Sequence, residues 1–452
     1  MTFDPRHRTW VTSDRPVPRS FVRPIIRFSE IEASSGIVLL LAAIAAIIWA
    51  NSVWSETYFS ILDKELIIEL GGFHLEESVL HLINDGLMAI FFFVVGLEIK
   101  RELVVGDLRD PKAAALPVMA ALGGMILPAL IYILFNAGAA SPDAIRGWGI
   151  PMATDIAFAI GVVALLGSKV PSGAKLFLLA VAIADDIGAI GVIALFYTEE
   201  LNAGYLAAAV GGLIVVWIAA RIHVRALWFY VPISLVIWFF TLESGVHATL
   251  AGVALGFLTP ARPHYTPEEM DTRARAILDQ YPTEVENHHD QEHVDHEALL
   301  LAEIAKESVS PLNRAEHYLV PWSSFLIVPL FALANAGVDF RNVSITDALT
   351  STVALGVSLG LVLGKILGIS GFTIAAVRLG LGRLPTGTSW RHVFGLAAIA
   401  GIGFTVSLFV TSLAFADPQL TDFAKVGIFA GSLVAGVTGV LILRGARPPS
   451  EL

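Results

Sequence analysis

Apolar stretches long enough to cross a lipid bilayer recur along this chain of 452 residues, from Ile31 to Leu443. Hydrophobic residues make up 55% of the sequence and charged residues only 15%. Inside a bilayer every backbone polar group must find its partner within the protein, so segments of this composition cross as helices. The sequence therefore predicts an all-α polytopic membrane protein. The absence of cysteine excludes disulfides and thiolate metal sites, and the net charge of −11 does not favour nucleic-acid binding.

The hydropathy pattern predicts twelve transmembrane helices, and the basic residues predict their orientation. The spans are expected near residues 32–50, 79–99, 113–135, 145–166, 174–197, 203–220, 226–241, 245–260, 318–337, 351–377, 392–415 and 423–443. Spans 1–8 thus occupy residues 32–260, and spans 9–12 occupy residues 315–443. Lys and Arg gather in every second loop and in the tails 1–31 and 444–452, whereas the alternate loops are acidic. Because cytoplasmic loops carry the excess of Lys and Arg, both tails are expected in the cytoplasm.

The first external loop carries two short alternating segments, near residues 64–77, on either side of Gly71-Gly72. Alternation around a Gly-Gly pair indicates a β-hairpin. Two interpretations fit this hairpin about equally well. It forms a contact between two copies in a homodimer, or it is a solvated loop.

An acidic insert, residues 261–314, separates the eighth and ninth expected spans. Its stretch NHHDQEHVDHE carries the four histidines His288, His289, His293 and His296. Histidine clusters can bind Zn²⁺ or respond to pH. The favoured interpretation is a solvated, partly disordered cytoplasmic linker, because the segment is rich in charge and poor in apolar residues.

Asp185 and Asp186 are the only charged residues between Leu176 and Thr198. About nine apolar or small residues flank the pair on each side, which places it near the bilayer midplane. A charged residue there costs roughly 2.5–3.5 kcal/mol on insertion scales, and adjacent carboxylates also repel each other. A chain keeps such a pair where the acids bind or relay something. The pair therefore predicts a cation or proton site.

Three more polar residues lie deep in expected spans: Thr154, Asp155 and Lys365. Thr154 alone could bond back to its own helix, and a lysine near a helix end can extend to the membrane surface. Lys365, however, has apolar residues on both sides for several positions. Side chains 185 and 186 point about 100° apart on a helix. One of them is therefore expected to line a water-accessible cavity and the other to face a neighbouring helix, where Lys365 can pair with it.

These residue types suit exchange of a cation for protons. Carboxylate, hydroxyl and carbonyl oxygens are ligands for hard cations such as Na⁺ or Li⁺. A carboxylate in apolar surroundings also takes up a proton more readily than one in water. One site that accepts either a cation or protons, never both, is the minimum machinery for antiport.

Backbone breaks are expected in the fourth and eleventh spans. Pro151 and nearby glycines interrupt the fourth span, and Gly395, Gly401 and Gly403 interrupt the eleventh. Broken helices leave unpaired N–H and C=O groups at the midplane, so Asp155 is expected to offset positive helix ends and Lys365 negative ones. The glycines of GVALG (252–256) and GLVLG (360–364) instead predict close helix packing.

Seven segments together closely resemble the NhaA-type Na⁺/H⁺ antiporters, and the likeness runs from about Ser34 to the C-terminus. They are INDGLMAIFFFVVGLEIKRE (83–102), PMATDIAFAIGVVALLGSKVP (151–171), AIADDIGAIGVIALFYT (182–198), SGVHATLAG (244–252), PLFALANAGV (329–338), GKILGIS (364–370) and GIGFTVS (401–407). The resemblance implies twelve helices in inverted repeats, with crossed, discontinuous spans 4 and 11. It also implies electrogenic, pH-regulated export of Na⁺ and Li⁺ in exchange for H⁺ across the bacterial plasma membrane, without a cofactor.

The same resemblance implies roles for individual residues. Asp185, Asp186 and Thr154 would form the Na⁺ and proton site, Lys365 would pair with Asp185, and Asp155 would compensate helix ends. Acids and bases at a cytoplasmic funnel would tune pH activation; the matching positions are Glu98, Arg101, Glu102, Glu316 and His317. The Arg-rich tail and the acidic insert exceed what is typical of compact members. Because the insert directly precedes Glu316 and His317, its charge is expected to bear on the pH response.

Three other classes were weighed against an antiporter. Cation-coupled uptake of an organic solute is the alternative within transport, although no cluster of polar side chains suited to a larger substrate is evident. An intramembrane aspartyl protease would need a GxGD motif, which is absent. An ATP-driven pump would need a phosphate-binding loop, whereas Gly364-Lys365 lacks the required glycine spacing. The chain is therefore not expected to be an enzyme.

Overall fold

The computed structural model describes residues 33–70, 73–139, 141–198, 201–224, 226–281, 288–341 and 344–446. Most of these residues are helical, and the one sheet among them has two strands. The expected all-α class is thereby confirmed. The tail 1–31, the Gly71-Gly72 turn and most of the C-terminal tail, 447–452, lie outside the described residues.

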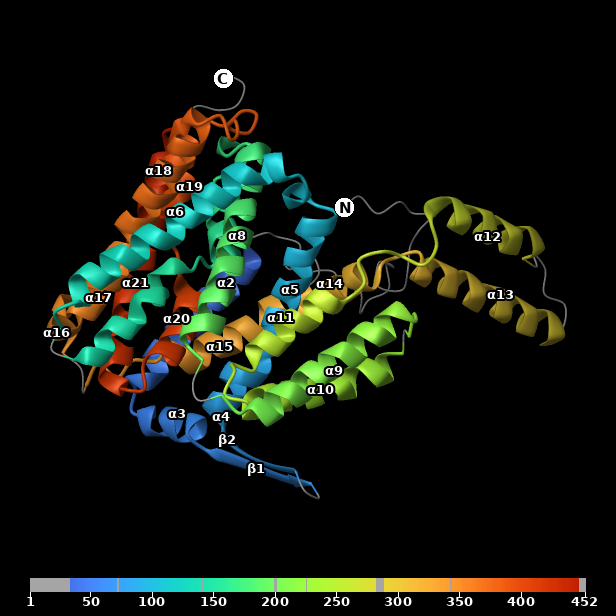
Figure 1. The fold of residues 1–452 in the computed structure, drawn as a ribbon, viewed down its shortest axis with the longest axis horizontal. Coiled ribbons are helices and arrows are strands. Elements are labelled where there is room, and N and C mark those ends of the chain that lie inside the picture. Colours follow the sequence, from blue (N-terminus) through green and yellow to red (C-terminus); the bar gives the residue numbers. More distant parts are fainter. Residues whose placement is uncertain are drawn as a thin grey trace.

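The elements follow one another in this order (Figure 1). The first part of the chain forms α2 (Ser34–Ala50), α3 (Ser55–Leu62), β1 (Glu65–Leu70), β2 (Phe73–Ser78), α4 (Val79–His81), η3 (Leu82–Leu87), α5 (Met88–Val104), η4 (Asp107–Arg109), α6 (Pro111–Asn136), η5 (Pro142–Met152), α7 (Ile156–Leu165), η6 (Gly167–Lys169) and α8 (Ser172–Phe196). The remainder forms α9 (Ala203–Arg221), α10 (Leu227–Glu243), α11 (Thr249–Leu258), α12 (Pro267–Gln280), α13 (His288–Glu307), α14 (Pro311–Trp322), η7 (Ser323–Ile327), α15 (Val328–Asn335), α16 (Ile345–Thr350), α17 (Thr352–Leu359), η8 (Gly360–Gly364), α18 (Lys365–Arg378), α19 (Trp390–Ile399), α20 (Phe404–Ala414) and α21 (Pro418–Arg444). The turns η3, η7 and η8 are π-helical and lie inside longer helices.

Among the described residues, seven helices are long and apolar enough to cross a membrane, or up to ten spans if each of three bent helix pairs is counted as one. The shorter apolar helices α10 and α11 lie where the seventh and eighth spans were expected. The chain is therefore a polytopic membrane protein. The exact number of twelve spans stays a prediction.

Two long helices begin with the same local signal, an aspartate N-cap followed by proline. Asp110 precedes Pro111 at the start of α6 and accepts a 3.0 Å hydrogen bond from the Lys112 N–H. Asp417 precedes Pro418 at the start of α21 and accepts a 2.8 Å bond from the Gln419 N–H. The aspartate satisfies an N–H that has no partner within the helix, and proline loses none because it has no N–H to pair.

Two of the three bent pairs are the spans that were expected to be discontinuous. The axes of η5 and α7 differ by 45°, and those of α19 and α20 by 46°. The backbones of the two breaks are joined directly, because the Asp155 N–H donates a 2.7 Å hydrogen bond to the Ile402 carbonyl. Each break therefore satisfies part of the other's unpaired backbone at the point where the two spans meet.

Glycines let α6 approach the η8–α18 helix at very short range. A Cβ on Gly364 would lie 2.7 Å from the Cα of Pro128 in α6, closer than side chains pack. The same holds between α11 and α5, where a Cβ on Gly256 would lie 2.7 Å from the Phe93 carbonyl oxygen. Both glycine pairs therefore pack helices closely, as their spacing predicted. The first contact also fixes the start of α18, where Lys365 is the first residue.

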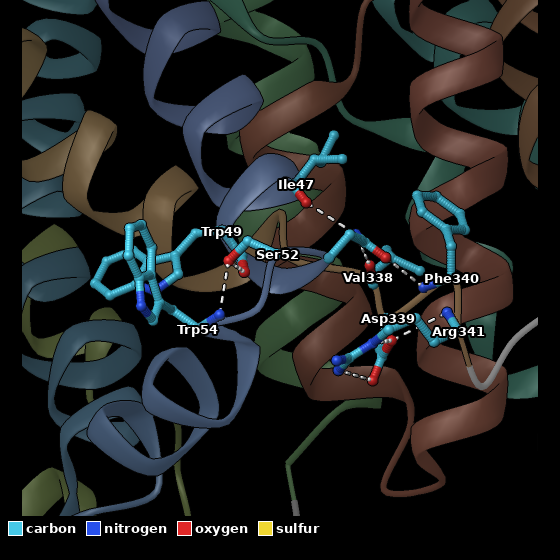
Figure 2. A network of polar contacts seen from close by, with 9 residues as sticks. Ile47, Trp49, Ser52, Trp54, Val338, Asp339, Phe340 and Arg341 are labelled. Carbon is cyan, nitrogen blue, oxygen red and sulfur yellow. Dashed lines mark hydrogen bonds and ion pairs between the residues drawn. The ribbon is translucent and has the colours of Figure 1, made fainter.

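Asn51, at the end of α2, fastens that helix to the loop after α15 (Figure 2). Its amide nitrogen donates 2.8 Å bonds to the carbonyls of Ile47 and Val338, and its oxygen accepts a 2.9 Å bond from the Phe340 N–H. Next to Phe340, Arg341 forms an ion pair with Asp339 at 2.8 Å. One side chain therefore joins two segments far apart in the sequence at one end of the bundle.

Two features project from the helix bundle in Figure 1. The strands β1 and β2 form an antiparallel hairpin in which Glu65 is opposite Ser78 and Leu70 is opposite Phe73. The insert contributes α12 and α13, which extend sideways from the bundle. Local bonds support the first of these two helices: a capping box joins Thr266 and Glu269, and Arg275 pairs with Asp271 at 2.9 Å. Across the described residues, no group of three or more His, Cys, Asp or Glu side chains could hold a metal ion.

Candidate functional site

Lys365 lies at the centre of a buried polar cluster beside the two breaks, and its side chain is fully buried. Its ammonium group donates to the Met152 carbonyl at the end of η5, to Thr154 Oγ1 at 3.0 Å and to Asp185 Oδ2 at 2.6 Å. These three bonds use all three of its N–H groups. The ammonium therefore compensates a carboxylate and the carbonyl end of a broken helix at once.

Asp185 and Thr154 complete this cluster. The hydroxyl of Thr154 lies 2.8 Å from Asp185 Oδ2 and 2.8 Å from the Ala400 carbonyl, at the break after α19. A hydroxyl has one hydrogen, so it can donate to only one of these acceptors at a time. The second carboxylate oxygen, Asp185 Oδ1, is buried and has no hydrogen-bond partner within the described structure. The cluster thus holds one free oxygen ligand and a hydroxyl that can switch partners.

Asp155 caps two helices that begin at the breaks. Its Oδ1 accepts a 3.0 Å bond from the Phe158 N–H in the first turn of α7. Its Oδ2 accepts a 3.1 Å bond from the Thr405 N–H and a 2.5 Å bond from the Thr405 hydroxyl, in the first turn of α20. A negative charge at two helix N-termini offsets the partial positive charge of both.

Asp186 differs from its neighbour, although both are buried on α8. Asp186 is 7% exposed and Asp185 is 1% exposed. Among the described residues, the Asp186 carboxylate has no hydrogen bond and no ion pair, whereas Asp185 has both. Burial of an unpaired carboxylate is costly, so such a group needs a proton or a cation as its partner.

A second charged group lies along α5 and α14. Arg101 forms an ion pair with Glu316 and lies 3.5 Å from Glu102. Glu98 lies within electrostatic range of these three side chains and also of Asp186. His317 is exposed, and its ring packs edge-on against Tyr318 at 5.7 Å. The structure thus brings four of the five expected funnel residues together and leaves His317 beside them.

Sequence reasoning missed several partners that the structure places at the site. Thr405, which binds Asp155, lies within the GIGFTVS motif but was given no role. Ser407, in the same motif, donates a 2.7 Å bond to the Ile150 carbonyl and is fully buried. The carbonyls of Met152 and Ala400 carry no side-chain signal at all. A hydroxyl four residues after a glycine of the break was the one available hint, because it can reach a freed backbone group.

The fold and this cluster together define a class of protein. Buried charges at the meeting point of two broken spans, in a polytopic membrane protein, are the arrangement of a secondary transporter. Two unpaired carboxylate positions and a hydroxyl supply the hard oxygen ligands that a small cation such as Na⁺ requires.

Comparison with known proteins gives the family. Residues 26–443 match the family model described as Na⁺/H⁺ antiporter 1. The chain is 45% identical over 437 residues to the Na⁺/H⁺ antiporter NhaA of Koribacter versatilis, covering 95% of this chain and 93% of that one. It is 47% identical over 431 residues to the NhaA of an Anaeromyxobacter species, with 95% and 93% covered. It is 46% identical over 424 residues to the NhaA of Bordetella parapertussis, with 94% and 96% covered.

The chain therefore belongs to the NhaA family of Na⁺/H⁺ antiporters. It exchanges Na⁺ for H⁺ across a membrane; it is a transporter rather than an enzyme, and members of this family need no cofactor. The expected family is confirmed. Solute symport, the alternative within transport, has no support in these comparisons.

Proposed function

We propose that this antiporter exports Na⁺ and Li⁺ from the bacterial cytoplasm in exchange for protons, with Asp185, Asp186 and Thr154 as the ion site. The observation that carries this assignment is that Asp186 and Oδ1 of Asp185, on consecutive residues of α8, have no hydrogen-bond partner among the described residues. A cation entering between them gains two carboxylates and the Thr154 hydroxyl as ligands. Protons on the same groups would compete with it directly.

The proposed cycle follows from that competition. A cation binds on the cytoplasmic side and displaces the protons that the site holds. The loaded site then opens to the outside, where the cation leaves and protons return to Asp186 and to the Asp185–Lys365 pair. Rocking of one group of helices against the other, around the crossed breaks, would alternate the access.

Electrogenic exchange follows if the cation displaces two protons. Asp186 would release one proton, and the Lys365 ammonium would release the second when the cation takes its position at Asp185. Two protons entering for each Na⁺ leaving would move one net positive charge inward per cycle. Asp155 would remain at the two helix N-termini, and its full set of hydrogen bonds supports a compensating role.

We also propose that the charged group Glu98, Arg101, Glu102 and Glu316 tunes the response to pH, with His317 at its border. Its electrostatic reach to Asp186 through Glu98 supports this role. The acidic insert 261–314 leads directly into this region and is proposed to modulate it from the cytoplasm.

The proposed setting is the plasma membrane, with both tails in the cytoplasm. Two hydrogen bonds support this orientation, because they place the basic loops and the C-terminal end of α21 at the same end of the bundle: Lys169 donates to the Arg444 carbonyl, and Arg391 donates to the Ile442 carbonyl. The acidic hairpin β1–β2 would then face outwards. Its unpaired strand edges could join two copies in a homodimer, and both interpretations of the hairpin, dimer contact and solvated loop, remain proposals.

The test is collapse of a pH gradient by Na⁺ in everted bacterial vesicles, comparing wild type with Asp186→Asn. The matched control is Asp63→Asn, which changes an exposed aspartate outside the site. We expect Na⁺ and Li⁺ to collapse the gradient with wild type and the control but not with Asp186→Asn. Full exchange by Asp186→Asn at normal expression would contradict the assignment of the ion site.

A further inference from the structure

His392 occupies an unusual position in a helix cap at the start of α19. Ser389 is the N-cap of this helix and His392 is its third residue, the two positions of a capping box. In an ordinary capping box the third residue is Glu or Gln, whose oxygen accepts the N–H of the cap residue. Here an imidazole does so, because the Ser389 N–H donates to His392 Nδ1 at 3.0 Å.

The bonds of the ring define one protonation state. Nδ1 accepts from the Ser389 N–H and lies 2.8 Å from the Ser389 hydroxyl. Nε2 lies 3.2 Å from the Lys169 carbonyl, which can only accept, so Nε2 carries the hydrogen. Both bonds form together only in the neutral ring with its hydrogen on Nε2. A proton on Nδ1 would face the Ser389 N–H and remove the acceptor.

This side chain also joins the two broken spans a second time. Lys169 lies in η6, directly after α7, so the His392–Lys169 bond links the far end of α7 to the start of α19. The near ends of the same two half-helices already meet at the ion site, through Asp155 and Ile402 and through Thr154 and Ala400. These two half-helices, α7 and α19, are thus held at both ends. At the outer end the linking side chain is His392, whose bond from the Ser389 N–H requires a neutral ring.

His392 itself is fully buried, but its partners lie at the surface: Lys169 is exposed and Ser389 is half-buried. The charged groups on the adjoining ends of the elements packed against this turn are all cations: Lys169, Lys175, Arg378, Arg383, Arg391 and Arg444. The acids of these elements, Asp155, Asp185, Asp186 and Asp422, lie at the breaks or at the opposite end of α21. Because Lys169 and Ser389 reach the surface, a local opening of the Ser389 turn gives a proton access to the ring.

We propose that His392 is a positioning residue whose protonation opens this cap, separates the outer ends of α7 and α19, and so sets the acidic limit of exchange. The inference rests on the proposed pH regulation and names a residue for it. Histidine suits the task because it is the side chain that ordinarily changes charge between pH 5 and 8.

The discriminating variant is His392→Gln, because glutamine supplies the usual acceptor of a capping box without titrating. We expect wild-type rates at alkaline pH, with activity extending about one pH unit further into the acidic range. His392→Ala, which removes both bonds, should lower exchange at every pH. His223→Gln, at an exposed histidine in the loop after α9, is the matched control and should keep the wild-type profile.

A second readout does not require transport. Hydrogen–deuterium exchange of the segment 388–396, corrected for the intrinsic pH dependence, should rise between pH 8 and pH 6 in wild type and stay constant in His392→Gln. The same comparison in an Asp186→Asn background tests the cap even if the ion-site assignment fails. An unchanged acid limit in His392→Gln, or the same pH step in both proteins, would overturn the proposal.

Discussion

Replacing Lys365 with alanine should destabilise the protein more than any change of a surface lysine. The substitution removes three hydrogen bonds and leaves the Asp185 carboxylate and the Met152 carbonyl buried without their donor. Breaking a buried ion pair by removing one partner costs about 3–5 kcal/mol. For a chain of this size, a loss of about 3 kcal/mol lowers the melting temperature by about 3 °C.

The assay is thermal unfolding of the detergent-solubilised protein, followed by loss of the monodisperse peak in size-exclusion chromatography. The design is a double-mutant cycle with Lys365→Ala, Asp185→Asn and the combination. Lys365→Ala leaves the Asp185 carboxylate buried without its cation, and Asp185→Asn removes that negative charge. The double variant should therefore melt at a higher temperature than the sum of the two single-variant losses predicts. Lys169→Ala, at an exposed lysine with one bond to a backbone carbonyl, should stay within about 0.5 kcal/mol of wild type.

Two outcomes would refute this reasoning. A melting temperature of Lys365→Ala close to wild type would mean that the ammonium group does not hold the cluster together. Strict additivity in the cycle would mean that Lys365 and Asp185 contribute independently, despite the 2.6 Å between their charged atoms.

Two further substitutions test the contacts that surround the site. Thr405→Val keeps the side-chain volume but removes the hydroxyl that donates to Asp155. We expect the free energy of unfolding to fall by about 1–2 kcal/mol and Na⁺/H⁺ exchange in vesicles to slow. If neither value changes, Thr405 does not help Asp155 to compensate the helix ends. Asn51→Ala removes the bonds to Ile47, Val338 and Phe340 (Figure 2). Because Asn51 bonds to none of the proposed ion-site residues, its replacement should lower the melting temperature by a few degrees with exchange retained in the surviving protein. Loss of exchange at normal stability would contradict a purely structural role.

The sequence was informative wherever a polar residue violated the apolar pattern. Asp185, Asp186 and Lys365 stand out because a charged side chain in lipid has a large unfavourable free energy, and the flanking residues in the sequence are apolar and cannot pair with them. Pro151 and Gly403 likewise marked the two bent spans. Proline removes a backbone hydrogen bond of the helix, and glycine makes the backbone more flexible.

The remaining contacts could not be predicted, because they depend on which helix ends meet in space. The carbonyls of Met152 and Ala400 become ligands only where two breaks cross, and a backbone carbonyl looks the same in every sequence. The helices α12 and α13 of the insert were not predicted from the sequence for a different reason. Their support comes from caps and from pairs four residues apart, such as Asp271 and Arg275, which an overall excess of charge conceals.

The polar groups at the crossing cancel one another almost completely, and the exceptions lie at the ion site that we propose. Asp155 accepts hydrogen bonds from two helix N-termini, and Lys365 donates hydrogen bonds to a helix carbonyl and to one oxygen of Asp185. What remains is the Asp186 carboxylate and Asp185 Oδ1, on adjacent residues of one helix. A buried negative charge of this kind cannot move between the two sides of a membrane uncompensated, so each change of access requires either a cation or protons in the site. If the proposed site is correct, the free energy needed to change access with this site empty and charged makes the exchange obligatory. No separate gate that distinguishes the bound ion is then needed.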